Sequence, residues 1–417
     1  MAEVAIITVN YNGARYLPQY FQSIFGQTYK SIKLIVIDNN SSDGSQDLLK
    51  QHNNIIFVQN QSNIGFAAAN NQGLRYLDSD TKYIFLLNND TRLDSRCIEE
   101  LVRAIKKDNK IGAVSPKMLL YHPFIKISVL SSSPGKADFH EDRLGKLRVA
   151  IDGELALDYS SSRKYINGKF MYYQNGIGGG EYWWVAENPM YVPLIGPVDK
   201  TYKLEIVFNS SREIIGKRVR IVVNNTFCDE QAINKAQGSL CIDLTPKLLN
   251  NSCYLLNNVG SYINKHIHVC DIGFGQEDAG QYNQPHDIEA FCGGAVFIKR
   301  ELLQRDIFNG YFFVYYEDVD LSYKIRKMGY RLVYSPQARV YHYLWGWWFR
   351  DELLSNYYYV RNRLIFIMRN YSGSVITREF LKHLLKGSFF GLKYPRVFRT
   401  AICSCVDILR NLRRVYE

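Results

Sequence analysis

Two acidic motifs directly follow apolar runs, and they are the first candidates for chemistry in this chain. Residues 34–37 are apolar and lead into Asp38 and a turn rich in serine. Residues 83–87 are again apolar and lead through two asparagines into Asp90. A carboxylate at a strand end can accept hydrogen bonds from a ribose or a base edge, or hold a divalent cation beside a diphosphate. The competing interpretation of both motifs is helix capping without a ligand.

A third acidic pair and one histidine lie closer to the C-terminus. Glu317 and Asp318 open a segment with helical spacing that runs to Met328, and aromatic residues 311–313 precede them. Acids in a first helical turn can simply complement the helix dipole. Behind an aromatic run they are also typical of a general base beside a wall that stacks on sugars. His342 follows the last predicted strand, where a metal or phosphate role competes with an ordinary structural one.

The elements that would position these residues alternate between strand and helix. Strands are predicted at residues 4–9, 34–37, 55–58 and 83–87, and a helix at residues 17–24. This alternation predicts a parallel sheet with covered faces, whose ligands bind beyond the carboxyl ends of its strands. After residue 285 the alternation of strand and helix patterns returns, with a last strand at 332–334 that is expected to end before Pro336.

A segment with a different residue pattern separates these two α/β stretches. Between about residues 130 and 270, short runs of Val, Ile, Tyr and Trp alternate with Gly, Asn, Ser and Pro, which predicts a β-sandwich or jelly-roll insert. Its Trp183 and Trp184 would suit stacking on sugar rings, and the alternatives are a spacer or a dimer contact. We therefore expect an α/β half at 1–130, a β-rich insert at 131–270, a second α/β half at 271–350 and a basic, aromatic helical region at 351–417.

The bulk composition limits the classes of partner. A formal net charge of +11 indicates an anionic partner such as nucleotide phosphates, an acidic membrane or nucleic acid. Nucleic acid is disfavoured because no recognised binding motif accompanies the charge. No secretion signal opens the chain, and no apolar run reaches the roughly 18 residues of a membrane span. We therefore expect a cytoplasmic protein with reduced cysteines, for which attachment to the inner face of the membrane stays open.

The C-terminal region combines cations with apolar side chains. Lys and Arg between residues 378 and 414 far outnumber the acids Glu379, Asp407 and Glu417. They are interleaved with Leu and Phe, a pattern typical of a helix that lies in an anionic membrane interface. The alternative is that the apolar face packs on the rest of the chain or on a second subunit of a homo-oligomer.

The motifs occur in an order that resembles the family 2 glycosyltransferases of the GT-A fold, and especially their rhamnosyltransferase-like branch. The matching segments are residues 6–13, 36–45, 63–71, 86–91, 292–295, 316–321 and 340–342. They span roughly residues 3–125 and 270–370, and the β-rich insert departs from the compact family members. The resemblance implies a GT-A, Rossmann-like mixed sheet with an inserted sandwich-like domain and a helical C-terminal region.

The resemblance also implies three groups of site residues. The donor would be bound by Thr8, Asn10, Asp38, Gly65, Asn71, Asn88 and Asn89. The acceptor side would be formed by Gly293, Gly294 and Trp345. Asp318 would be the catalytic base with Glu317 beside it, while Asp90 and His342 would hold Mg²⁺ or Mn²⁺. Asn88 replaces the first acid of the family's metal motif, so metal binding would depend more heavily on Asp90.

The activity implied is inverting transfer of a hexosyl or rhamnosyl group from a dTDP- or UDP-sugar. The acceptor would be a glycan or a lipid-linked glycan, in polysaccharide or glycoconjugate biosynthesis. The alternative from another class is an inactive carbohydrate-binding protein on a transferase scaffold. Joint retention of Asp90, Asp318 and His342 favours the enzyme.

Overall fold

The computed structural model describes most of the chain. The described residues are 2–131, 146–158, 165–166, 169–170, 190–209, 215–216, 218–303, 306–343, 352–391 and 395–416. They divide into two compact units, one of residues 1–121, 257–274 and 280–417, and one of residues 122–256 and 275–279. Trp183, Trp184 and Trp345, named above as sugar-stacking or acceptor residues, lie outside the described residues.

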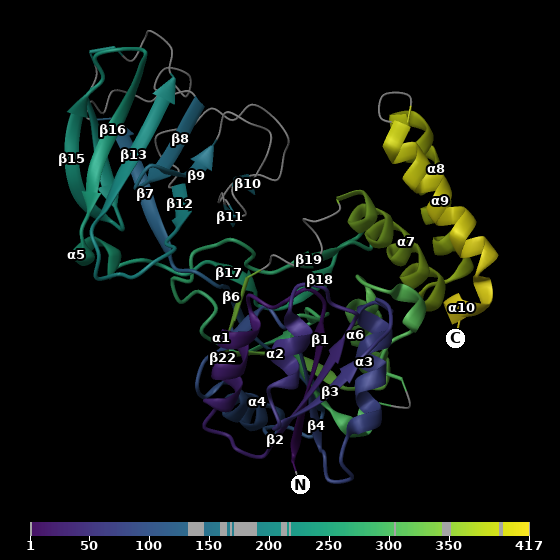
Figure 1. Ribbon diagram of the computed structural model, residues 1–417. Helices are drawn as coiled ribbons and strands as arrows, with labels where there is room; N and C mark the ends of the chain where they lie inside the picture. Colours follow the sequence, from purple (N-terminus) through teal and green to yellow (C-terminus); the bar gives the residue numbers. More distant parts are fainter. Residues whose placement is uncertain are drawn as a thin grey trace. The chain divides into compact units, whose positions relative to one another are not determined.

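A mixed sheet organises the first unit (Figure 1). Its parallel part has the order β3-β2-β1-β4, formed by β1 (Val4–Asn10), β2 (Ile32–Asp38), β3 (Ile55–Gln59) and β4 (Tyr83–Leu87). The antiparallel strand β21 (Ala295–Lys299) pairs with both β4 and β6 (Ile111–Leu120). Next to β6 come β22 (Arg331–His342) and β20 (His286–Ile288), and β5 (Thr91–Leu93) pairs with the end of β22. The expected GT-A-type mixed α/β fold class is confirmed.

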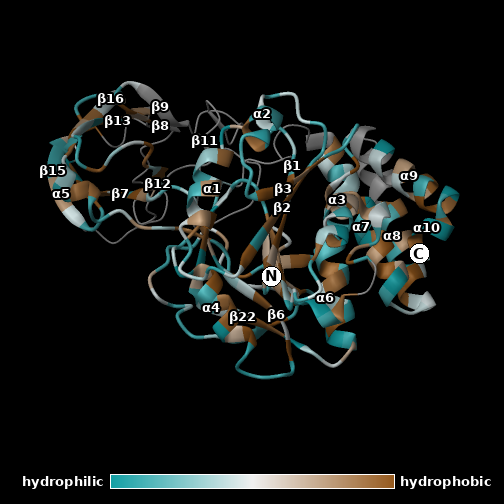
Figure 2. Ribbon diagram, turned by 60° about the horizontal axis from the view of Figure 1, so that its bottom comes forward, coloured by the Kyte–Doolittle hydropathy of each residue, from teal (hydrophilic) through white to brown (hydrophobic). Residues whose placement is uncertain are grey.

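Helices cover both faces of this sheet because its strands are apolar on both sides. Alternate residues such as Ile6 and Phe85 share one core with α1 (Leu17–Phe25) and α4 (Cys97–Ile105). On the other face, α3 (Phe66–Gly73) approaches closely, since a Cβ on Gly73 would lie 2.5 Å from Cγ2 of Ile7. Figure 2 shows the hydrophobic strands in the centre with helices around them. The remaining elements here are α2 (Ser45–Lys50), η1 (Leu74–Tyr76), η3 (Arg300–Leu302), η4 (Gly310–Phe312) and α6 (Glu317–Lys327).

The last strand of the sheet is longer than the sequence indicates. We predicted that it ends before Pro336, but β22 continues to His342. An irregularity in its pairing with β6, between Ser335 and Arg339, takes up the proline. This arrangement follows the general rule that proline is tolerated in a sheet at bulges, where no ladder hydrogen bond is required. The continuation carries His342 to a position opposite Thr91 of β5.

The second unit is a sandwich-like β structure with its own core. One sheet has the order β12-β7-β14-β15, from β12 (Met190–Pro193), β7 (Phe124–Ser131), β14 (Arg218–Val223) and β15 (Thr226–Ala232). The other strands are β8 (Lys146–Ile151), β9 (Glu154–Asp158), β10 (Tyr165–Ile166), β11 (Lys169–Phe170), β13 (Tyr202–Asn209) and β16 (Gln237–Leu244), and α5 (Pro246–Leu249) follows them. Ile127 and Ile221 of the first sheet share one buried cluster with Ile206 of β13 and Leu240 of β16.

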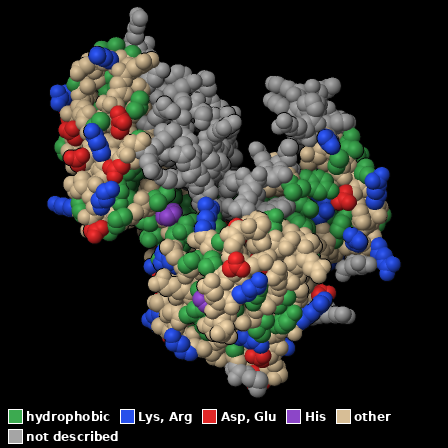
Figure 3. Space-filling model, viewed as in Figure 1, with side chains coloured by type: hydrophobic (Ala, Val, Ile, Leu, Met, Phe, Trp, Pro, Cys, Tyr) green, Lys and Arg blue, Asp and Glu red, His purple; other side chains and the backbone are tan. Residues whose placement is uncertain are grey.

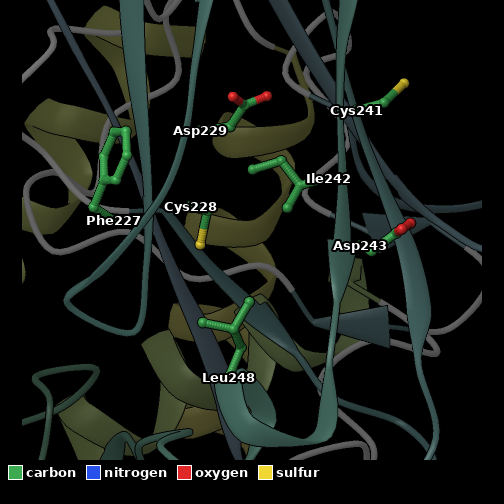
Figure 4. A pocket seen from close by; sticks show the side chains of 7 residues that line it. All are labelled: Phe227, Cys228, Asp229, Cys241, Ile242, Asp243 and Leu248. Carbon is green, nitrogen blue, oxygen red and sulfur yellow. The ribbon is translucent and has the colours of Figure 1, made fainter.

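An open hollow of about 420 Å³ lies beside the edge strands β15 and β16 of this second unit (Figure 4). The apolar side chains of Ile242 and Leu248 line it together with Cys228. Asp229 and Asp243 add carboxylates, and the ring of Phe227 is well exposed. The hollow therefore offers both apolar surface and hydrogen-bond acceptors.

The first unit also contains a short hairpin and the C-terminal helices. Strands β18 (Ser261–Ile263) and β19 (Val269–Asp271) form the hairpin, which follows β17 (Leu256–Asn258) in the chain. The helices are α7 (Glu352–Asn370), α8 (Gly373–Gly391), α9 (Pro395–Arg410) and α10 (Leu412–Tyr416). Among the described residues, none of the helices has the length and apolar character needed to cross a membrane.

Candidate active site

The carboxyl ends of β1, β2 and β4 meet in one hydrogen-bonded network. The side-chain amide of Asn10 donates to Oδ2 of Asp38 at 2.7 Å, and its Oδ1 accepts from Nδ2 of Asn89 at 2.6 Å. Both oxygens of Asp38 accept from Ser41, from its hydroxyl at 2.6 Å and its backbone N–H at 2.9 Å. Because buried polar groups are costly without partners, these bonds fix the orientation of each side chain. The parallel register that aligns Asn10 with Asp38 makes the contact possible.

Other predicted donor residues have different partners. Thr8 is fully buried, and its hydroxyl pairs with that of Tyr20 from α1. The side chain of Asn71 is bound to the backbone of Phe308, to its carbonyl at 2.7 Å and its N–H at 2.9 Å. Thr8 and Asn71 thus lie outside the network around Asp38. Asn88 donates its backbone N–H to the carbonyl of Gly294 at 2.9 Å, which links a residue of the predicted donor side to one of the predicted acceptor side.

Gly65 immediately precedes α3 and lies directly against the loop before the acidic pair. Its φ is +86°, and a Cβ there would come within 2.4 Å of the ring of Phe313. The carbonyl of Phe313 accepts hydrogen bonds from the N–H groups of Phe66, at 2.6 Å, and Ala67, at 3.1 Å. Only glycine satisfies both the positive φ and the close approach. The position therefore couples the first turn of α3 to the loop at Phe313.

Asp90 and His342 form the pair that could hold a cation. Asp90 is 4% exposed, and its Oδ1 lies 3.2 Å from Nε2 of His342 without a hydrogen bond of good geometry. Nδ1 of His342 is 2.8 Å from Oδ1 of Asn257, an atom that can only accept. In the neutral ring, this contact would place the proton on Nδ1 and leave the lone pair of Nε2 toward Asp90. A buried carboxylate oxygen without a partner beside an imidazole lone pair fits a divalent cation.

The protein supplies only part of such a site. Across the described ranges, no group of three or more His, Cys, Asp and Glu side chains gathers in a way that could hold a metal. Asp90 and His342 would therefore need further oxygen ligands, which a diphosphate and water can provide. This composition is typical of a cation that is bound together with a phosphorylated substrate rather than in a cage made of protein alone.

The acidic pair opens helix α6. Oδ2 of Asp318 accepts the backbone N–H of Gly293 at 2.8 Å, and Oδ1 accepts that of Val319 at 2.8 Å. Burial raises the pKa of Asp318 to about 6 despite these two bonds, and the charge of Asp271 adds to the increase. Glu317 is buried with no partner for Oε2; burial first, and then the charge of Asp318, raises its pKa well above the usual value. A carboxylate with a pKa of about 6 can accept a proton near neutral pH, which is the property required of the predicted base at Asp318.

A strained loop presents this pair. Phe313, Tyr315 and Tyr316 all have positive φ, of 64°, 69° and 69°, which is costly for aromatic residues. Helix α7 holds the loop through Asn362, whose Nδ2 lies 2.7 Å from the carbonyls of Phe312 and Val314 and 2.9 Å from that of Tyr315. Strain of this kind persists only where surrounding contacts enforce it, and it concentrates at functional sites.

Sequence reasoning did not find several of these supporting residues. Ser41 lies inside a recognised motif, so its hydroxyl was available as a signal. Asn257, Arg361 and Asn362 lie far along the chain from the groups they bind, and neither spacing nor an apolar run marks them. Arg361 donates to the carbonyl of Tyr311 at 2.6 Å. Such contacts depend on the folded arrangement of distant segments.

The first part of the chain is similar in sequence to a known protein family. Residues 5–119, which contain most of β1 and of β6 and all the elements between them, match the model of the glycosyl transferase family 2. A poly-beta-1,6-N-acetyl-D-glucosamine synthase of Staphylococcus aureus is 30% identical over 115 residues, which is 27% of this chain and 27% of that protein. An uncharacterized glycosyltransferase of Nostoc sp. is 34% identical over 90 residues, 19% of this chain and 28% of that protein. The chain thus spans about a quarter of the length of these curated relatives.

Two solved structures show a limited likeness to the chain. Staphylococcus aureus TarS is 17% identical, with a TM-score of 0.26 over 28% of this chain and 36% of that one. GalNAc-T7 with UDP, GalNAc and Mn²⁺ is 13% identical, with a TM-score of 0.45 over 88% of this chain and 48% of that one. Likeness at these scores carries no argument about activity.

Proposed function

We propose that the chain is a glycosyltransferase that moves a sugar from a nucleotide sugar to a hydroxyl of a glycan or lipid-linked acceptor. One observation carries the proposal: the adjacent residues Gly293 and Gly294 bind both Asp318 and the end of the strand that leads to Asp90. Gly293 donates to Asp318, and Gly294 accepts from Asn88, two residues before Asp90. The same short loop thereby connects the proposed base, Asp318, to the strand end that carries Asp90, the acid proposed to act on the phosphate side. A displacement reaction requires such groups to be held in a fixed arrangement around the reacting carbon.

The chemistry assigned to Asp318 is removal of one proton. Its carboxylate accepts the proton of the acceptor hydroxyl as that oxygen attacks the anomeric carbon. A new C–O bond forms, the bond to the diphosphate breaks with its electron pair, and the configuration inverts. The pKa of about 6 keeps Asp318 ionised at pH 7 while leaving it basic enough to share a proton in the transition state. A divalent cation, when bound at Asp90 and His342, would neutralise charge on the departing diphosphate.

The donor side is assigned to the network of Asn10, Asp38 and Asn89, with Asn88 and Gly65 beside it. Thr8 and Asn71 are proposed to support this side from outside the network, as their partners indicate. The donor class is a dTDP- or UDP-sugar, transferred as a hexosyl or rhamnosyl group in polysaccharide or glycoconjugate biosynthesis. The match of residues 5–119 to the family 2 model supports nucleotide-sugar binding in general.

The C-terminal helices support a proposed contact with an anionic membrane surface. Leu381 and Leu385 on α8 and Leu409 on α9 are 54%, 68% and 62% exposed. Arg378 and Arg410 are exposed near them on the same helices, and Figure 3 shows Lys and Arg side chains along this part of the molecule. Exposed leucines among cations suit the boundary between lipid headgroups and acyl chains, where a lipid-linked acceptor would lie. Pairing with a second copy is the alternative for this face.

The side chains that line the hollow of the sandwich unit favour a second function for the protein, which is non-catalytic binding of glycans. The hollow beside β15 and β16 combines the exposed ring of Phe227 with the carboxylates of Asp229 and Asp243. Aromatic rings stack on sugar faces, and carboxylates accept from sugar hydroxyls. If this unit binds glycans, Phe227→Ala should reduce the signal of the full chain on a glycan array. An unchanged signal would reject the assignment.

Release of nucleoside diphosphate from a panel of nucleotide sugars, with and without added glycan, tests the proposed activity. Release that depends on both donor and acceptor is expected. If the wild-type protein binds glycans but no donor supports release, the inactive carbohydrate-binding alternative is preferred.

A further inference from the structure

Asp271, at the end of β19, is an exposed residue, and two buried side chains fix the direction of its carboxylate. Its Oδ1 accepts from Nδ2 of Asn258 at 2.7 Å and from the hydroxyl of Ser261 at 2.8 Å. Asn258 and Ser261 are 0% and 1% exposed. The residue has exposed surface, yet burial by surrounding atoms raises the pKa of its carboxyl, and the hydrogen bonds from Ser261 and Asn258 only partly offset this effect. The arrangement orients a charge that the fold itself does not require.

Both of these hydrogen bonds reach the same oxygen. The described residues provide no hydrogen bond to Oδ2 of Asp271, and no ion pair neutralises the carboxylate. Asn258 and Ser261 are also joined to each other at 3.0 Å, so the support is rigid on one side. Oδ2 is therefore an oriented acceptor that has no hydrogen-bond donor among the described residues.

Backbone hydrogen bonds connect this carboxylate to the proposed base. The N–H and carbonyl of Ser261 pair with the carbonyl and N–H of Ala290, each at 2.9 Å. Three residues further on, Gly293 donates its N–H to Asp318 at 2.8 Å. Backbone hydrogen bonds thus join the hairpin that carries Asp271 to the segment whose Gly293 binds Asp318.

Electrostatic effects place the two acids in the same neighbourhood. Burial raises the pKa of the Cys292 thiol, and the charges of Asp271, Asp318 and Glu317 raise it further. Like charges held together destabilise a fold, so an uncompensated acid beside a candidate base is typical of a binding site. An anionic ligand would be repelled there, whereas a polyhydroxylated neutral one would not.

We propose that Asp271 binds the acceptor: its free Oδ2 accepts hydrogen bonds from hydroxyls of a neutral sugar whose reacting hydroxyl lies at Asp318. The proposal rests on the proposed transferase function and adds the class of acceptor. Hydrogen bonds from hydroxyls to a carboxylate are short and about twice as strong as those between neutral groups. The site should therefore prefer acceptors that present hydroxyls to Asp271. Acceptors that carry a carboxylate or phosphate near the reacting hydroxyl would be excluded.

The variant Asp271→Asn tests this assignment because it keeps the shape and the acceptor atom that Asn258 and Ser261 use. It replaces Oδ2 with an NH₂ group that cannot accept a hydrogen bond. We expect the acceptor KM to rise roughly ten- to hundredfold, as loss of a charge-assisted hydrogen bond predicts, with donor Kd unchanged and kcat reduced much less. Asp287→Asn, an exposed acid of β20 that pairs with Arg331, is the matched control and should change neither constant.

A pH profile adds a readout that a purely structural role would not move. The groups acting on Asp318 are Glu317 on its own helix, Asp271 from β19, and the N–H groups of Gly293 and Val319. Since the charge of Asp271 raises the pKa of Asp318, its removal should shift the acid limb of kcat/KM to lower pH. Asp271→Ser, which also removes the charge, should reproduce the shift if Asp271→Asn folds poorly.

Glycan binding keeps the inference testable whether or not turnover is found. The full chain on an array of neutral and acidic glycans should prefer neutral ones, and Asp271→Asn should lose much of that signal. Equal binding by wild type and variant, or no binding of neutral glycans by the wild type, overturns the acceptor assignment. Absence of nucleoside diphosphate release in the wild type with every donor would overturn the proposed transferase instead.

Discussion

Replacing Asp318 with asparagine should reduce activity and increase stability at the same time. The variant keeps the side-chain shape but removes the proton acceptor, so turnover should fall by roughly 10²- to 10⁴-fold. At 1.36 kcal/mol for each factor of ten, this corresponds to about 2.7 to 5.4 kcal/mol of lost transition-state stabilisation. Donor affinity should stay nearly constant, because the donor-side network of Asn10, Asp38 and Asn89 does not include Asp318.

The stability effect follows from the raised pKa of Asp318. The folded protein raises this pKa from 3.8 to about 6, so the native state binds more protons than the unfolded state between these values. Stability therefore falls as pH rises through this window, by at most about 3 kcal/mol for a group that keeps partial contact with water. Asp318→Asn removes this penalty, so its melting temperature should exceed that of the wild type at pH 8, and the difference should shrink toward pH 4.

Single-turnover release of nucleoside diphosphate, calorimetric donor binding and thermal unfolding at two pH values measure these effects. In the wild type, kcat/KM should be level above pH 6 and should fall about tenfold for each pH unit below it. Asp80→Asn, at an exposed acid, is the control and should leave activity unaltered. Near-normal turnover of Asp318→Asn, or a profile that stays level down to pH 4, would refute the assignment of the base.

Three further predictions concern the cation, the strained loop and the membrane. Asp90→Ala should abolish any dependence of donor affinity on Mg²⁺ or Mn²⁺, and equal calorimetric affinities of the wild type with metal and with chelator would contradict the cation role. Asn362→Leu should lower kcat more than donor affinity, because buried carbonyls that lose a partner cost about 1 to 3 kcal/mol each and release the strained loop; unchanged kcat in a stable variant would count against it. Co-sedimentation with anionic liposomes at low salt should weaken with salt and in the variant that carries Leu385→Ser and Leu409→Ser, whereas neutral liposomes should bind neither protein.

Much of the α/β architecture can be predicted because its strands are fully buried. Runs such as residues 34–37 and 83–87 have no polar interruption, so their ends are visible in the sequence, and polar residues follow at once. The parallel neighbours β1, β2 and β4 then bring Asn10, Asp38 and the residues after Leu87 to one edge. This much follows from pattern and from the rules of parallel sheets.

The individual bonds could not be predicted, for a physical reason. A polar side chain such as Asn257 or Asn362 contributes nothing to periodicity, and its partner is chosen by geometry that exists only after folding. The bulge that carries β22 past Pro336 is equally invisible, because local proline rules favour ending the strand. The orientation of Asp271 depends on two residues that look like ordinary turn formers in the sequence.

The position of β21 between β4 and β6 has a consequence for synthesis on the ribosome. Strands β4 and β6 are complete by residue 120, but the strand that joins them begins only at Ala295. Until then both strands present unpaired edges, which are templates for association with other chains. The sandwich unit, made in between with its own core, can fold during this delay. We therefore expect the nascent chain to depend on chaperones over this interval, and fragments that end before β21 to aggregate.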